Sequence, residues 1–483
     1  MRKKVLLCLT IVGMCVGMLI GCGKNDAQSG EQQVQTGEGA GAPGNEAGGA
    51  GQGTVDAEAE ETVQEAVENE EESAQETKKP AKEWSTPEDY RVVAEYVVPE
   101  SIADSEYDME AALTCVPLKE AFEPYFKFGL AMSGYNAQTF AVESPEMQEL
   151  LKYHCNTTTA TNLMKPSYML VQAACQEASA NGVEDPVLDF TVTDKMLAFC
   201  QENGIGVRGH TLVWHAQTPD WFFREGYLDD GAYVDAETMK YRLESYIRQM
   251  LTFCQDNYPG VVYCWDVVNE CVEPADLEAE SGWRCRTSGE SPEGTNQWYD
   301  ILGYEYVELA FTYARKYAAE GVSLVYNDYN SWYSEKSFYI YELMEYLQSK
   351  GLVDALGMQC NLSVDSDLMD VYTSVAKYAE LGLELQVTEL NIVAADTSPE
   401  SYEKQAACYK KFIQYMLALD DSNGGASNIT VVNIFSLMDG YLMYESDSNN
   451  YCVFDCNIEP KPNYYSMLEA VIKLGKHNPD VIQ

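Results

Sequence analysis

Two glutamates, Glu270 and Glu389, stand near the ends of short apolar runs that are typical of buried strands. A carboxylate in such a place needs a reason, because burying a charge is costly unless it is paired or functional. Paired carboxylates across a cleft suit cleavage of a glycosidic bond, in which one protonates the departing oxygen and the other attacks or activates water. The alternative is a structural salt bridge to each glutamate, but few Arg or Lys residues lie near them in the sequence.

Other polar side chains collect at equivalent points of the neighbouring runs. They are His210, Trp214, Asn269, Asn327, Asp328, Gln359 and Asn361. Barrel enzymes build their sites on the face where the carboxyl ends of parallel strands meet, so we expect these side chains to lie together there. A purely structural sheet would gain nothing from such a set of amides and charges.

The elements that would position these residues alternate between strands and helices. Short β-branched or aromatic runs predict strands at 126–132, 155–160, 206–214, 261–269, 323–328, 354–361, 384–390 and 430–437. Helical spacing of apolar residues predicts helices over 310–317 and 402–419. This alternation predicts an α/β fold, a closed (β/α)8 TIM barrel. A doubly wound open sheet is the alternative, disfavoured because no G-x-G-x-x-G sequence opens a helix after a strand.

Composition narrows the classes of partner. The 483 residues carry a formal net charge of −46, which disfavours nucleic acid and anionic lipid as partners and favours neutral or cationic ones. The chain has only four histidines, and His210 and His215 would point to opposite faces of a strand. We therefore expect no metal site and no cofactor, and we expect a monomer.

The first residues resemble a targeting signal. The sequence M-R-K-K precedes a short apolar run over 5–20, and L-I-G-C ends at Cys22. This pattern predicts a bacterial lipoprotein signal peptide at 1–21 and lipidation of Cys22, whereas the run is short for the alternative, a transmembrane anchor. Residues 22–83, rich in Gly, Gln, Ala and Glu, predict a flexible acidic linker before a barrel domain at 84–483. We therefore expect a protein held at the bacterial cell surface, anchored to the outer face of the cell membrane.

Fifteen cysteines are scattered without the paired spacing of metal sites. Cys264, Cys271 and Cys285, or Cys452 and Cys456, would be able to oxidise outside a cell, although the sequence fixes no pairing. Free thiols packed in the core are the favoured interpretation.

Three motifs carry a family resemblance. V-R-G-H-T-L-V-W-H begins at Val207, C-W-D-V-V-N-E ends at Glu270, and V-T-E-L contains Glu389. With these motifs in order, the chain resembles glycoside hydrolase family 10, the family of retaining endo-β-1,4-xylanases, over roughly residues 115–475. The resemblance implies a TIM barrel that cleaves β-1,4-xylan through a covalent glycosyl-enzyme intermediate.

The resemblance also implies roles for individual residues. Glu270 would be the general acid/base and Glu389 the nucleophile, with carboxyl groups about 5–5.5 Å apart. Asn269 would hold the sugar 2-hydroxyl. The other implied substrate-binding residues are Asn162, Lys165, His210, Trp214, Gln359, Asn361 and Phe435. For Trp214, simple core packing remains an alternative.

The chain departs from the family pattern beside the nucleophile. Where the family has Q-x-H and T-E-L-D, this sequence has Q-C-N ending at Asn361 and T-E-L-N ending at Asn391. Two neutral amides can hydrogen-bond each other, whereas an aspartate without its histidine would be an unpaired charge beside Glu389 and would raise the pKa of that glutamate. We expect Asn361 to donate an N–H to Glu389, a weaker support than a charge-assisted bond from histidine.

Two further departures, Thr161 and Phe435 in place of a family Glu and Trp, would reshape the substrate-binding subsites. The leading prediction is a retaining endo-1,4-β-xylanase acting on xylan or a related β-glycan. One alternative is a cell-surface glycan-binding protein with weak or altered β-glycosidase activity. Another, a Schiff-base enzyme that uses Lys165, leaves the paired glutamates unexplained.

Overall fold

The computed structural model describes residues 91–92, 109–132, 134, 140–278, 282–289, 294–440 and 450–472. These residues fall within one compact unit, Ser85–Gln483. The predicted signal peptide at 1–21, Cys22 and the predicted linker over 22–83 lie outside the described residues.

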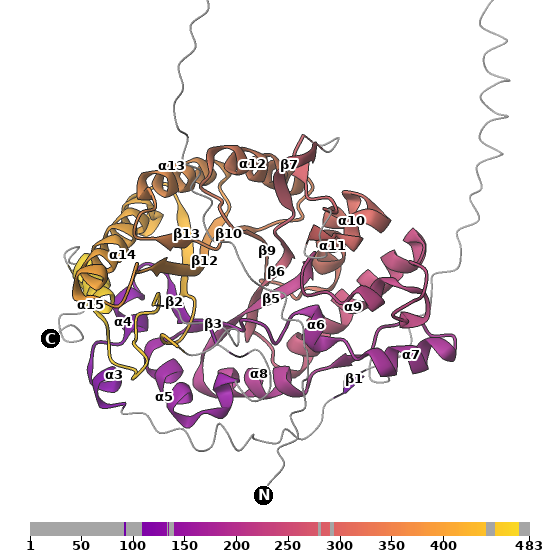
Figure 1. The fold of residues 1–483 in the computed structure, drawn as a ribbon, viewed down its shortest axis with the longest axis horizontal. Helices are drawn as coiled ribbons and strands as arrows, with labels where there is room; N and C mark the ends of the chain where they lie inside the picture. The colour runs from indigo at the N-terminus through magenta and orange to yellow at the C-terminus, as the bar shows by residue number, and fades with distance from the viewer. Residues whose placement is uncertain are drawn as a thin grey trace, which may run out of the picture. The chain divides into compact units, whose positions relative to one another are not determined.

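Eight parallel strands form a closed barrel (Figure 1). In chain order they are β2 (Lys127–Leu130), β3 (Thr157–Thr159), β5 (Gly206–Trp214), β6 (Val262–Asn269), β9 (Ser323–Asp328), β10 (Ala355–Met358), β12 (Glu384–Val393) and β13 (Asn428–Ile434). The sheet closes because β10 pairs with both β9 and β12. The described strands outside the ring are β1 (Arg91–Val92), β4 (Leu188–Asp189), β7 (Val272–Glu278), β8 (Arg284–Cys285) and β11 (Asn361–Ser363). The predicted (β/α)8 barrel is confirmed, and every predicted strand overlaps a barrel strand.

Helices form the outer layer around the strands (Figure 1). They are α3 (Glu110–Thr114), α4 (Leu118–Phe122), α5 (Pro145–His154), α6 (Pro166–Met169), α7 (Gln172–Ala180), α8 (Thr191–Asn203), α9 (Ala236–Asn257), α10 (Gln297–Leu302), α11 (Glu305–Tyr317), α12 (Ser334–Ser349), α13 (Leu368–Tyr378), α14 (Pro399–Leu419) and α15 (Pro462–Ile472). The predicted helices lie inside α11 and α14. In the described ranges, no helix combines the length and the hydropathy needed to cross a bilayer.

The strands are buried on both faces, as parallel strands covered by helices must be. All six residues of β9 are buried, including the polar Asn327 and Asp328 at its carboxyl end. Local signals fix where helices begin: the side chain of Asp235 accepts a hydrogen bond from Thr238 N at 2.7 Å and caps α9. The barrel is therefore a rigid core that presents the carboxyl ends of its strands on one face.

Candidate active site

Glu270 is held by a backbone turn directly after β6. Its φ is 58°, a left-handed value that is uncommon outside glycine. Two hydrogen bonds to the main chain of Glu270 fix the turn: Glu270 N donates to Asn327 O at 2.9 Å, and the side-chain Nε of Arg286 donates to Glu270 O at 3.0 Å. Strained backbone of this kind is common at functional sites, and here it places a carboxylate at the mouth of the barrel.

Glu389 lies inside β12 where the strand loses its regular pairing. The register with β13 shifts between Val387 and Leu390, and β10 pairs with β12 only as far as Val387. Pairing with β11 begins again at Asn391. An irregularity of this kind changes the direction in which side chains point, so the Glu389 side chain does not follow the regular alternation between the two faces of the sheet.

Both oxygens of the Glu270 carboxylate accept hydrogen bonds. Trp214 Nε1 donates to Oε2 at 3.0 Å, and Gln359 Nε2 donates to Oε1 at 2.7 Å. The sequence predicted that Trp214 and Gln359 line the site, and the structure places both there. Core packing alone does not explain Trp214, because its indole N–H reaches the carboxylate.

Asn327 joins the two halves of the site. Its Nδ2 donates to Asn269 Oδ1 at 2.9 Å and to Glu389 Oε1 at 3.4 Å. Its side-chain oxygen Oδ1 accepts a hydrogen bond from Thr388 Oγ1 at 2.7 Å, which fixes the orientation of the amide. Asn327 was noted at a strand end in the sequence, but nothing there showed that it contacts both Asn269 and Glu389.

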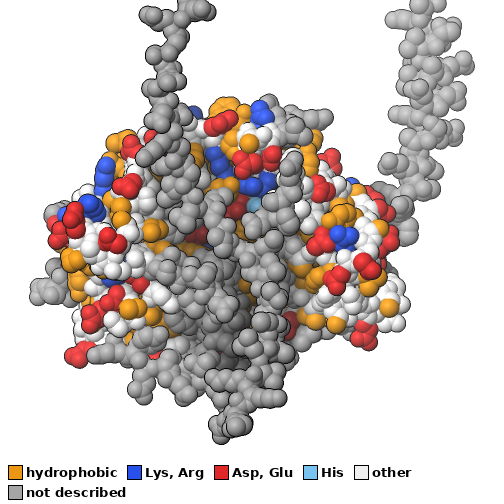
Figure 2. All heavy atoms as spheres, in the orientation of Figure 1, with side chains coloured by type: hydrophobic (Ala, Val, Ile, Leu, Met, Phe, Trp, Pro, Cys, Tyr) orange, Lys and Arg blue, Asp and Glu red, His pale blue; other side chains and the backbone are white. Residues whose placement is uncertain are grey.

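Two cations that act on the Glu270 carboxylate are paired with other carboxylates. Arg286 Nη2 lies 3.1 Å from Glu273 Oε2, and Lys336 Nζ lies 2.8 Å from Asp328 Oδ1. Figure 2 shows a small group of Lys and Arg side chains beside a histidine on this face, among more widely spread Asp and Glu. Within the described residues neither Glu270 nor Glu389 forms an ion pair, so the salt-bridge alternative for these glutamates finds no support.

The two glutamates have pKa values displaced in opposite directions. Burial and the charge of Glu270 raise the pKa of Glu389 from 4.5 to about 7. Burial also raises the pKa of Glu270, but His215, the Gln359 amide, Lys336 and Arg286 together bring it below its ordinary value. The two carboxyls therefore titrate as a coupled pair and hold one proton between them over much of the acidic and neutral range.

His210 is oriented by a buried ion pair. Its Nδ1 lies 2.8 Å from Asp266 Oδ2, and the guanidinium of Arg208 contacts both oxygens of Asp266 at 2.5 and 3.1 Å. All three side chains are buried. Asp266 stands inside the C-W-D-V-V-N-E motif, yet its role in holding His210 was missed from the sequence.

Lys165 and Asn162 lie together after β3. Lys165 Nζ donates to Asn162 Oδ1 at 3.2 Å and lies 4.7 Å from the centre of the Trp214 ring, a cation–π contact. Both residues are buried. The structure thus brings them together beside Trp214, and their role in binding substrate stays a prediction. Lys165 belongs to a polar cluster here, which gives no sign of the apolar pocket that a Schiff-base lysine needs.

The amide pair of Asn361 and Asn391 connects to Glu270, through Gln359, and not to Glu389. Asn391 Nδ2 donates to Asn361 Oδ1, so the predicted contact between the two asparagines is confirmed. Asn361 Nδ2 donates to Gln359 Oε1 at 3.3 Å, and Gln359 in turn donates to Glu270. The predicted bond from Asn361 to Glu389 is wrong, because the exposed Asn361 amide turns toward Gln359. The chain of amides therefore ends on Glu270.

Phe435, the last predicted binding residue, directly follows β13. Its backbone N donates to Leu390 O at 3.0 Å, which ties it to the strand that carries Glu389. The side chain is 6% exposed. This position is compatible with a wall of the site, although the structure records no ring contact between Phe435 and the other predicted residues.

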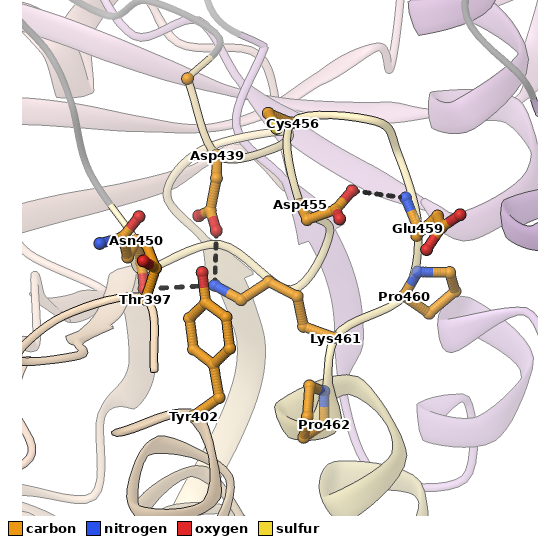
Figure 3. A pocket seen from close by; sticks show the side chains of 11 residues that line it. Thr397, Tyr402, Asp439, Asn450, Asp455, Cys456, Glu459, Pro460, Lys461 and Pro462 are labelled. Atoms are coloured by element: carbon orange, nitrogen blue, oxygen red, sulfur yellow. Dashed lines mark hydrogen bonds and ion pairs between the residues drawn. The ribbon is translucent and has the colours of Figure 1, made fainter. Parts of the chain in front are cut away.

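A cavity of about 560 Å³ lies apart from these residues, between the start of α14 and the segment that follows β13 (Figure 3). Inside it Lys461 Nζ lies 2.6 Å from Asp439 Oδ2 and donates to Asn450 O at 3.2 Å. None of the predicted site residues lines this cavity. Its buried ion pair has its charges matched, and we assign it a structural role.

No described group of three or more His, Cys, Asp and Glu is arranged to hold a metal ion. The described cysteines are free thiols, and most of them are buried. The pairs considered from the sequence are therefore unbridged in this structure.

Comparison with known proteins agrees with the geometry. Residues 117–470 match the model of Glycosyl hydrolase family 10. The chain is 45% identical over 317 residues to a provisionally named endo-1,4-beta-xylanase of Caldicellulosiruptor saccharolyticus, covering 64% of this chain and 96% of that protein. It is 38% identical over 373 residues to endo-1,4-beta-xylanase B of Butyrivibrio fibrisolvens, covering 75% of this chain and 55% of that protein.

Solved structures give the same result. The CBM22-1 and GH10 modules of endo-1,4-beta-D-xylanase 10B of Clostridium thermocellum, complexed with xylohexaose, align with a TM-score of 0.66 at 30% identity, over 76% of this chain and 70% of that one. An intracellular xylanase of Thermoanaerobacterium saccharolyticum, in a mutant complex with xylotetraose, aligns with a TM-score of 0.61 at 27% identity, over 74% of this chain and 99% of that one.

Proposed function

The chain belongs to glycosyl hydrolase family 10, and from this membership we infer that it is an endo-1,4-β-xylanase that hydrolyses the β-1,4-xylan backbone. The observation that carries the inference is that Glu270 and Glu389 meet at the barrel mouth, where Glu270 N donates to Asn327 O and Asn327 Nδ2 donates to Glu389 Oε1. The alternative of a glycan-binding protein gains nothing from the relatives named above, each of which bears the name of a xylanase.

We propose a retaining mechanism in which the two glutamates have distinct roles. Glu270 donates its proton to the departing glycosidic oxygen, while the ionised Glu389 attacks the anomeric carbon and forms a glycosyl-enzyme ester. Glu270 then removes a proton from water, which attacks the same carbon and releases Glu389. For the bond-forming step we expect the carboxyl groups to lie about 5–5.5 Å apart.

The pKa shifts of Glu270 and Glu389 indicate which of the two carboxyls carries the shared proton before the reaction. In the structure the shared proton is favoured on Glu389, because burial and the charge of Glu270 raise the pKa of Glu389 to about 7. The reaction needs the other arrangement, with the proton on Glu270. Both arrangements belong to the singly protonated pair, so we expect the pair to be competent only while it retains that proton.

The surrounding side chains would bind and orient the sugar. The side-chain oxygen Oδ1 of Asn269 accepts a hydrogen bond from Asn327. We propose that the amide N–H groups of Asn269 donate to a sugar 2-hydroxyl beside Glu389. Lys165 and Asn162 supply polar contacts from the wall after β3, and Trp214 offers an aromatic face. His210, Gln359, Asn361 and Phe435 complete the proposed set.

The test is reducing-sugar release from β-1,4-xylan by residues 84–483. We expect release by the unaltered chain and its loss in Glu270→Gln and Glu389→Gln, with mixed-linkage glucan and mannan as control polymers. Absence of release by the unaltered chain, with xylan still retained in a pull-down, would overturn the assignment in favour of a binding protein.

We further propose that the barrel is a lipid-anchored monomer on the outer face of a bacterial cell membrane. The support is the sequence L-I-G-C at Cys22 and the Gly-, Gln- and Glu-rich stretch over 22–83. Metabolic labelling with a radioactive fatty acid tests the anchor, since label should enter the full chain and be lost in Cys22→Ala. Analytical ultracentrifugation of residues 84–483 tests the monomer.

A further inference from the structure

A groove of about 470 Å³ lies between the start of α12 and the middle of α13. This volume falls within the range of about 300–1,000 Å³ that is typical of small-ligand sites. Its lining shares no residue with the proposed active site. The residues that carry the inference are Trp332, Tyr333, Ser337, Asp370, Thr373 and Ser374.

Two aromatic rings lie against each other in the groove. Tyr333 is 57% exposed and packs edge-on against Trp332, with ring centroids 5.7 Å apart and an interplanar angle of 80°. Trp332 is buried and fixed beneath the groove, since Ser374 Oγ donates to its backbone oxygen at 3.3 Å. A large aromatic side chain held in this exposed position offers an apolar face to a ligand.

The polar groups of the lining are rich in hydrogen-bond acceptors. Ser337, Thr373 and Ser374 each donate their hydroxyl hydrogen to a backbone carbonyl, at 3.0, 2.8 and 3.3 Å. Their oxygen lone pairs therefore remain as acceptors. The carboxylate of Asp370 makes no hydrogen bond or ion pair that the structure records within its described ranges. Such a lining suits a ligand that carries many O–H donors.

We propose that this groove is a second xylan-binding site, outside the cleft that holds Glu270 and Glu389. The proposal rests on the proposed function, because its ligand is the polymer that the cleft hydrolyses. A xylopyranose ring has equatorial hydroxyls that donate at its edge and C–H faces that stack on aromatic rings, which matches Tyr333 together with the acceptors. Lys377 also lines the groove, but its charge is paired with Glu380 Oε2 at 2.5 Å. The chain's net charge of −46 and the Asp370 carboxylate therefore disfavour an anionic ligand.

The groove is close enough to the cleft for one polymer to reach both. Asn327, which contacts Glu389, lies in β9, and a single connection leads from there to Tyr333 at the start of α12. Six residues of extended chain span at most about 20 Å. A polymer bound at both places gains avidity, whereas a short substrate bound only in the cleft does not.

The experiment compares polymer with short substrate. In the active protein, Tyr333→Ala with Asp370→Ala should raise the KM for soluble xylan about threefold or more, leaving kcat on xylan and all kinetics on an aryl xylobioside unchanged. In the inactive Glu270→Gln background, the same changes should weaken retention in gels that contain xylan by a similar factor. The matched control is Phe338→Ala. Phe338 lies in α12 and is 56% exposed, close to the exposure of Tyr333, but it does not line the groove.

Each other outcome refutes the second site. Unchanged KM and gel retention would mean that the groove binds no xylan, and an equal loss on the aryl xylobioside would mean that the changes act through the cleft. A dimer that Tyr333→Ala dissociates would assign the ring to self-contact. The gel measurement needs no turnover, so it tests the groove even if xylan hydrolysis fails, which is the separate test of the proposed function.

Discussion

Burial is the largest reason why the Glu389 carboxyl holds its proton, and the charge of Glu270 is the second. With carboxyl groups about 5.5 Å apart and an effective dielectric constant of about 20, two unit charges repel by about 3 kcal/mol, equivalent to about two pH units. Burial remains in Glu270→Gln and keeps part of the elevation. We therefore expect this substitution to lower the pKa of Glu389 from about 7 by about one to two pH units.

The assay uses an aryl xylobioside with a dinitrophenolate leaving group, which departs without protonation. The pre-steady-state burst then reports attack by Glu389 alone. Since only the ionised carboxylate attacks, the burst rate should rise with pH, with a midpoint near 7 in the unaltered chain and a lower midpoint in Glu270→Gln. On xylan, where Glu270 must supply a proton, kcat/KM should instead fall as the pH rises through about 7, because the pair loses its last proton.

Two controls make the result decisive. Glu389→Gln should give no burst at any pH. Glu273→Gln removes a nearby carboxylate that pairs with Arg286, and it should leave the midpoint in place. An unchanged midpoint in Glu270→Gln would refute the coupling of the two glutamates.

Three further predictions concern stability and the amide pair. Because folding raises the pKa of Glu389 from 4.5 to about 7, stability is lost as the pH rises from 4.5 through 7, so Glu389→Gln should stabilise the fold by up to about 3 kcal/mol at pH 8 and by little at pH 4.5, measured by urea unfolding. Asp266→Asn should destabilise the fold by about 3–5 kcal/mol, because it leaves Arg208 buried without its charge partner, and Asp266→Asn with Arg208→Met should recover part of the loss in the same measurement. Asn361→His alone should not raise kcat/KM on xylan, because its partner Asn391 is not an aspartate, and a large gain would contradict the view that the two positions act together.

The sequence predicted the barrel well because each strand carries a strong local signal. Predicted and observed limits coincide for β5 and β9, which are long or fully buried runs. The roles of Glu270 and Glu389 came from their motifs and from their places near strand ends, and the structure brings both to one face. The spacing of apolar residues and the short motifs are local properties of the chain, so they can be identified from a single sequence.

The details that were missed depend on contacts between distant segments. The direction of the Asn361 amide is set by Gln359 and Asn391, so its turn away from Glu389 had no local signal. Asp266 lay inside a recognised motif, but its contact with Arg208 and His210 follows from the pairing of β5 with β6. The groove between α12 and α13 likewise joins residues about forty positions apart, such as Tyr333 and Thr373.

The central claim is that Glu270 and Glu389 act as acid/base and nucleophile in a double displacement. Proton NMR of the first product formed from a xylo-oligosaccharide, recorded before the anomers equilibrate, tests this most directly. The two-carboxylate retaining mechanism predicts that the new reducing end appears first as the β anomer. First appearance of the α anomer would show a single displacement by water and would contradict Glu389 as the nucleophile.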